Sequence, residues 1–159
     1  MSARPRYRLP DEPRPGLLAA NASDPLWPFL GMMLVGTWFG LAWFAFNSFA
    51  LGSPTRLREL ALIALALIGS AALVLALNDA LARGWLDEHS VRYAVLSLTC
   101  LRMGCAYALS VLQSRVFELH AYFGGGARTG ATLLVLAMVI VKPTLAPLLG
   151  RGLLGVVLQ

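Results

Sequence analysis

Four apolar stretches, each near the length of a membrane-crossing helix, follow a polar N-terminal segment of the chain. A helix needs about 20 apolar residues to cross the hydrocarbon core of a bilayer. Inside lipid every backbone N–H and C=O must be bonded within the protein, so only helices and closed barrels cross. The chain lacks the series of alternating strands that is typical of a membrane barrel. We therefore predict an all-α integral membrane bundle of four transmembrane helices, at about 29–51, 60–77, 93–112 and 131–149.

The fourth stretch differs from the others because it contains Lys142, Pro143 and Pro147. Proline lacks an N–H and its ring clashes with the preceding turn, so it kinks or breaks a helix. The uninterrupted part, 131–141, is too short to cross a bilayer. We predict a span that is kinked by the two prolines. The alternative is a segment that enters the membrane and returns on the same side.

Residues 1–25 are rich in proline and arginine, and we predict a flexible basic tail that precedes a transmembrane domain at 26–159. The whole sequence is 58% hydrophobic, and 13 basic residues against 8 acidic ones give a net charge of +5. The basic residues are spread over the tail and the loops, a pattern that suits membrane flanks better than the continuous basic face needed for nucleic acid. We therefore expect contact with a lipid bilayer and none with nucleic acid.

The basic residues also bear on orientation, because loops that carry more lysine and arginine tend to stay in the cytoplasm. With four spans, both termini share a side with the loop 78–92, and that side holds seven basic residues against four in the other two loops. This count predicts that both termini are cytoplasmic. When only charges close to the spans are counted, the two sides are equal at four each, so orientation stays open.

Arg102 lies in the middle of the third stretch, about 15 Å from either end of the span, which is farther than a guanidinium extends. No aspartate or glutamate occurs in the four stretches, so the acceptors on offer are side chains such as Asn47 and Ser70, or the carbonyl that Pro143 leaves free. Arg102 is thus either a structural lock or the contact for a partner's carboxylate, an anionic lipid or an anionic solute. Lys142, nearer its helix end, is expected to extend toward the headgroups.

Small residues at intervals of four predict close helix packing. Gly36 and Gly40 form a GxxxG motif in the first stretch, and Gly104 and Ala108 make a similar small face in the third. Such residues let two helix backbones approach each other closely. Packing within the chain and dimerisation are both compatible with this pattern.

No motif supports catalysis, a cofactor or a metal. The run "FGGGARTG", 123–130, lacks the spacing of a phosphate-binding loop and follows a helix, so we predict a flexible connection. Glu118 and His120 are two residues apart and point away from each other on a helix, which is unsuitable for a metal. We predict no catalytic, cofactor-binding or metal-ligating residue, and no enzyme.

Two segments, "FNSFALGSP" at 46–54 and "FELHAYFGGGARTG" at 117–130, resemble segments of small polytopic bacterial inner-membrane proteins. In those proteins an asparagine near the end of the first span leads into a turn, and a histidine precedes a Gly-Gly loop. The matching residues here are Asn47, Leu51, Gly52, Pro54, His120, Gly125 and Gly126. A basic pair expected after the asparagine is replaced by Ser48 and Phe49. The resemblance implies a multi-helix architecture and a bacterial inner-membrane location, and no activity.

These observations favour a non-enzymatic accessory, assembly or interaction subunit of a bacterial inner-membrane complex. Its partner would be another membrane protein or a second copy of the chain. The alternative is a homo-oligomeric transporter or channel for a small anion, with Arg102 near the midplane and the broken fourth helix beside it.

Overall fold

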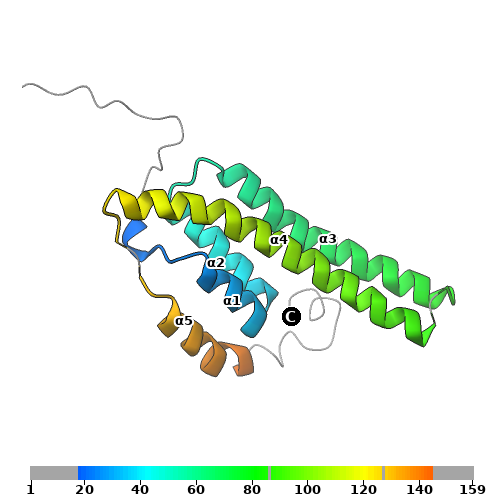
Figure 1. The fold of residues 1–159 in the computed structure, drawn as a ribbon. Helices are drawn as coiled ribbons and strands as arrows, with labels where there is room; N and C mark the ends of the chain where they lie inside the picture. Colours follow the sequence, from blue (N-terminus) through cyan, green and yellow to red (C-terminus); the bar gives the residue numbers. More distant parts are fainter. Residues whose placement is uncertain (1–17, 86, 127, 145–159) are drawn as a thin grey trace, which may run out of the picture.

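A computed structural model describes residues 18–85, 87–126 and 128–144. The described residues are helical and contain no strand, which confirms the predicted all-α class. Figure 1 shows the arrangement of the helices. Their order along the chain is η1 (Ala19–Asn21), α1 (Leu26–Leu34), α2 (Thr37–Ala50), α3 (Arg56–Ala82), α4 (Glu88–Tyr122), α5 (Ala131–Leu136) and η2 (Ala137–Val141).

The prediction of one continuous helix over 29–51 is wrong, because the chain reverses direction within this stretch. Helix α1 ends at Leu34, and Gly36 has a φ of 148°, a backbone conformation that residues with a side chain rarely adopt. The chain then returns along itself as α2, and the two helices form a hairpin (Figure 1). A hydrophobicity pattern records that both arms are apolar and does not show the reversal between them.

Helices α3 and α4 are the two helices that are long and apolar enough to cross a membrane. At 1.5 Å per residue they measure about 40 Å and about 52 Å, well beyond the hydrocarbon thickness of about 30 Å. Both therefore extend past the predicted limits of 60–77 and 93–112. Asp87 is the N-cap of α4, and hydrogen bonds from Ser90 lower the pKa of its carboxyl.

The fourth predicted span is described only as far as Thr144, so Pro147 lies outside the described residues. The described helix, Ala131–Thr144, is about 21 Å long and too short to cross a bilayer. Its π-helical part, Ala137–Val141, ends directly before Lys142 and Pro143. Pro143 cannot donate the backbone hydrogen bond that an α-helix would direct to Val139, so the disturbance falls in the turn where proline predicts it.

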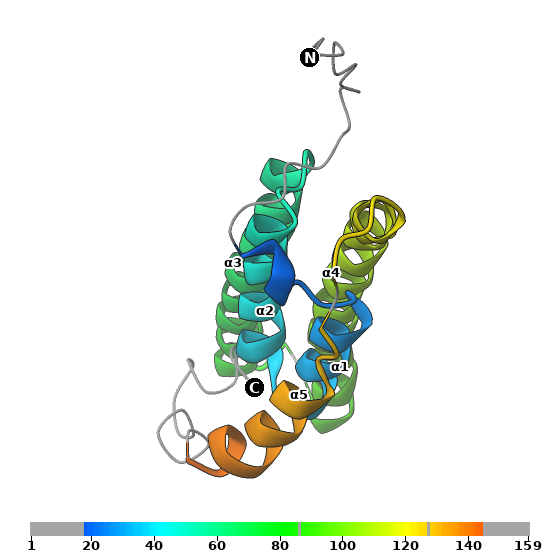
Figure 2. The same ribbon diagram turned by 90° about the vertical axis from the view of Figure 1, so that its left-hand side faces the viewer.

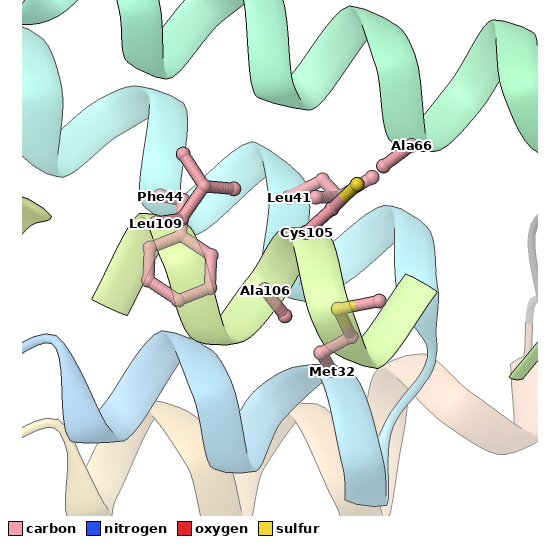
Figure 3. Packing of buried hydrophobic residues seen from close by; sticks show 7 residues of the cluster. All are labelled: Met32, Leu41, Phe44, Ala66, Cys105, Ala106 and Leu109. Carbon is pink, nitrogen blue, oxygen red and sulfur yellow. The ribbon is translucent and has the colours of Figure 1, made fainter. Parts of the chain in front are cut away.

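The helices pack in three layers, with the α1–α2 hairpin between the α3–α4 hairpin and α5 (Figures 1 and 2). Figure 3 shows the main core, to which the first four α-helices contribute. Its buried members are Met32, Leu41, Phe44, Ala66, Cys105, Ala106 and Leu109. A second cluster joins α5 to the hairpin through Val35, Trp43, Leu134 and Ala137.

The outer faces of the two long helices remain strongly apolar. Large hydrophobic side chains are exposed along α3 and α4, among them Leu65, Ile68, Leu75, Val95 and Leu96. Exposed apolar surface of this extent is unusual for a chain surrounded by water. The exposed faces agree with helices that contact lipid or another apolar surface.

Candidate functional site

Arg102 is buried between the two long helices. Its Nε donates a hydrogen bond to Ser70 Oγ of α3 over 3.2 Å. Ser70 is one of the acceptors that the sequence offered, and it is itself fully buried. This bond joins α3 to α4 across 32 positions of sequence, so the guanidinium helps to fix the two helices against each other.

Removing the Ser70 hydroxyl should weaken this contact. We expect Ser70→Ala to lower the free energy of unfolding by about 1–2 kcal/mol, because a buried hydrogen bond to a charged donor is lost. Ser97→Ala is the matched control, since Ser97 Oγ donates to the Ala94 carbonyl of its own helix. SDS-induced unfolding in mixed micelles, followed by circular dichroism, measures both variants. Equal stability of the two variants would contradict a stabilising Arg102–Ser70 contact.

A second polar group connects three helices at the end of the bundle where α3 begins. Glu59 is fully buried, and its carboxylate accepts hydrogen bonds from Ser53 Oγ, from Thr55 Oγ1 at 2.8 Å and from Gln113 Nε2 at 2.8 Å. The same Gln113 nitrogen also donates to the Phe44 carbonyl of α2 at 2.8 Å. Neutral donors thus satisfy a buried carboxyl group and tie α2, α3 and α4 together.

Glu59 and Gln113 are not predicted as partners from the sequence. Each residue lies just outside a predicted apolar run, where a polar side chain is expected to face water. The available signal was local: Ser53 and Thr55 precede α3 and can donate to a glutamate one turn further on. Gln113 is 54 positions away, and no pattern in a single sequence links it to Glu59.

Asn47, predicted as an intramembrane polar contact, forms hydrogen bonds with Ser23 in the short segment between η1 and α1. Its Oδ1 accepts from the Ser23 backbone N–H at 3.2 Å, and its Nδ2 donates to the Ser23 carbonyl at 2.8 Å. Trp43 Nε1 adds a bond to Ser23 Oγ at 2.9 Å. On the other side of this segment, the Arg128 N–H donates to the Ala22 carbonyl at 3.0 Å. We call this arrangement of Ala22, Ser23, Trp43, Asn47 and Arg128 the Ser23 clasp.

The glycine-rich loop after α4 packs on His120. The imidazole ring is buried, and a Cβ atom added at Gly125 would lie 2.2 Å from its Nε2. Any side chain at position 125 would therefore require the His120 ring to move. Together with the Ser23 clasp, this contact holds Gly125 and Arg128 of the predicted flexible connection against the bundle.

The remaining predicted residues fall in three different environments. Lys142 is exposed, and its Nζ donates to the Leu34 carbonyl at the end of α1 over 2.8 Å. Gly40 packs against Met32 inside the α1–α2 hairpin. Gly104 is exposed, with no atom of the described chain within 4 Å of an added Cβ, and Ala108 beside it is half-buried.

A pocket of about 900 Å³ opens between α2, α5 and the segments that form the Ser23 clasp. Aromatic and aliphatic side chains line most of it, including Trp38, Phe39, Trp43, Phe46, Leu133 and Leu136. Polar lining residues are Asn21, Ser23, Arg128, Thr129 and Thr132. No pattern in the sequence indicates this pocket, because α2 and α5 come to line it together only after the reversal between α1 and α2.

The fold and these sites define a helical protein with two helices long and apolar enough to cross a membrane. No protein-family model matches the chain, and neither a curated protein nor a solved structure matches it. Within the described ranges, no three His, Cys, Asp or Glu residues are grouped so that they could hold a metal ion.

Proposed function

We propose that the chain is a non-enzymatic integral membrane protein that acts as an accessory or assembly subunit of an inner-membrane complex in a bacterium. The observation that carries this proposal is that buried polar side chains form their hydrogen bonds within the chain. Arg102, Glu59, Asn47 and Gln113 bond to other groups of the same chain and join its helices. Polar groups used in this way support a rigid scaffold that presents apolar faces to its surroundings.

Membrane insertion is supported by the length of α3 and α4 and by their exposed apolar side chains. The bacterial inner membrane is inferred from the resemblance of 46–54 and 117–130 to small proteins of that membrane. In this proposal the α3–α4 hairpin crosses the bilayer, and the α1–α2 hairpin and α5 penetrate beside it from one side.

The two ends of the α3–α4 hairpin differ in basic residues. Figure 1 shows η1, the start of α3 and the loop after α4 at one end of the bundle, which we call the clasp end. By their positions in the sequence, the basic residues of these segments and of the last turns of α4 are Arg56, Arg58, Arg115 and Arg128. The opposite end carries Arg83 and Arg92. Because basic residues favour the cytoplasmic side, we propose that the clasp end faces the cytoplasm. The segment before α1 is then cytoplasmic, as the four-span prediction also had it. The loop 78–92, which that prediction placed on the same side, now lies on the opposite side.

Extraction from the native membrane in mild detergent, followed by native mass measurement, tests the accessory role. We expect a particle that contains a foreign membrane subunit in fixed stoichiometry. A particle made only of this chain that also conducts anions in liposomes would overturn the proposal in favour of the transporter alternative.

Matched variants locate the contact surface. Gly104→Leu should release the foreign subunit, because Gly104 is exposed on a small face that suits close helix approach. Ala64→Leu changes another exposed small residue, on α3, and should retain the subunit. Retention by both variants would show that the Gly104 face is not the contact.

A further inference from the structure

The pocket between α2 and α5 has a polar end and an apolar end. Asn21, Arg128 and Thr129 line it where α5 begins and the Ser23 clasp lies. Away from the clasp, α2 contributes Phe39 and Trp38, and α5 contributes Leu133 and Leu136. A charged group at one end of an apolar channel suits an amphiphile better than a small polar solute.

The charge of the polar end selects an anion. Arg128 has an exposed side chain, and no acidic residue is among the described residues that line the pocket. A guanidinium offers paired donors that match the oxygens of a phosphate. Asn21 and Thr129 supply further polar groups at the same end.

The apolar part has the length of a lipid chain within one leaflet. The pocket follows α2 from Phe46 to Trp38, which is about 12 Å at 1.5 Å per residue. One leaflet of a bilayer contributes about 15 Å of hydrocarbon. The residues of the polar end belong to η1 and to the loop after α4. Figure 1 shows both segments at the clasp end of the bundle, beside the last turns of α4, where headgroups would be found if α3 and α4 cross the membrane.

We propose that this pocket is a binding site for one anionic phospholipid, with its phosphate on Arg128 and an acyl chain between α2 and α5. The inference rests on the membrane location proposed above and is independent of the accessory role. A bound lipid would fill the space between α5 and the α1–α2 hairpin and join their surfaces.

Native mass spectrometry of the full chain tests the site. The protein is purified in detergent and incubated with equal amounts of phosphatidylglycerol and phosphatidylcholine. We expect one retained phosphatidylglycerol, and we expect Arg128→Gln to lower its preference over phosphatidylcholine about tenfold, as loss of a charge-assisted contact predicts. Arg83→Gln is the charge-matched control, since Arg83 lies at the opposite end and pairs with Asp79.

A second pair of variants tests whether an acyl chain occupies the apolar end of the pocket. Ala42→Trp should abolish retention of both lipids, because Ala42 is an exposed residue of the pocket wall. Ala64→Trp, on the outer face of α3, should leave retention unchanged.

Equal retention of the two lipids by the wild-type chain, or unchanged retention in Ala42→Trp, would overturn the proposal. Release of a protein subunit from Ala42→Trp with lipid retention intact would assign the pocket to a partner and also overturn it. A chain that retains phosphatidylglycerol but isolates without a foreign subunit would contradict the accessory role alone.

Discussion

Gly40→Ala should destabilise the protein by about 3 kcal/mol or more, because the added methyl group cannot be accommodated in the α1–α2 hairpin. A Cβ atom at Gly40 would lie 2.4 Å from Met32 Cβ and 2.7 Å from Met32 N and Cα. Two of these three atoms belong to the backbone, so a change of rotamer cannot relieve the contact. Either α1 must move away from α2 or the main core around Met32 must open. SDS-induced unfolding in mixed micelles measures the loss.

Gly104→Ala is the matched control for this experiment. It makes the same change in α4 at a position where the new methyl group meets open space. Alanine is favoured over glycine within a helix by about 0.5–1 kcal/mol, so this variant should be as stable as the wild-type chain or slightly more so. Equal stability of Gly40→Ala and Gly104→Ala would show that the hairpin is not packed as closely as described.

Gln113→Leu should lower the free energy of unfolding by about 2–4 kcal/mol, because a buried carboxylate loses a hydrogen-bond donor. The leucine fills a similar volume but leaves Glu59 Oε2 facing apolar groups, and the Phe44 carbonyl loses its bond from α4. Ser53 and Thr55 still donate to the other carboxylate oxygen, which limits the loss. The same unfolding assay gives the magnitude.

Two further variants separate the loss of this contact from a general effect of substitution. The double variant Glu59→Leu/Gln113→Leu should be more stable than Gln113→Leu by about 1 kcal/mol or more, since it removes the unsatisfied carboxyl oxygen together with its donor. Ser114→Ala, next to Gln113, removes a hydroxyl that bonds within its own helix and should change stability by less than about 0.5 kcal/mol. A double variant less stable than Gln113→Leu would argue against a buried hydrogen bond between Gln113 and Glu59.

The sequence predicted the helical class because the apolarity and the length of a run are local properties. It located α3 and α4 for the same reason, although their ends lie further out than the apolar limits. It failed at Gly36, because one glycine between two apolar arms serves equally well in a straight helix and in a reversal. The described part of the fourth stretch is also too short to span, while the turn disturbed by Pro143 falls where the residue type indicates.

The candidate sites were predictable only in part. Arg102 and Asn47 were selected because polar groups in apolar runs need partners, and the structure supplies Ser70 and Ser23. Their partners lie 32 and 24 positions away, separations that periodicity cannot reveal. The Ser23 clasp was unpredictable for the same reason. Ser23 bonds to Asn47 in the segment 46–54 and pairs with Arg128 in the segment 117–130, but it lies in neither segment.

The contact between Glu59 and Gln113 sets an order of events during synthesis of the chain. Ser53 and Thr55 leave the ribosome shortly before Glu59, so two donors are at hand when the carboxylate appears. Gln113 follows 54 residues later, after α3 and most of α4 have been made. Until then one oxygen of the carboxyl group lacks this donor, so in the membrane protein proposed above the start of α3 would stay near the aqueous boundary. Completion of α4 supplies that donor, so under the same proposal the newly made hairpin would reach its final depth in the membrane only when α4 is present.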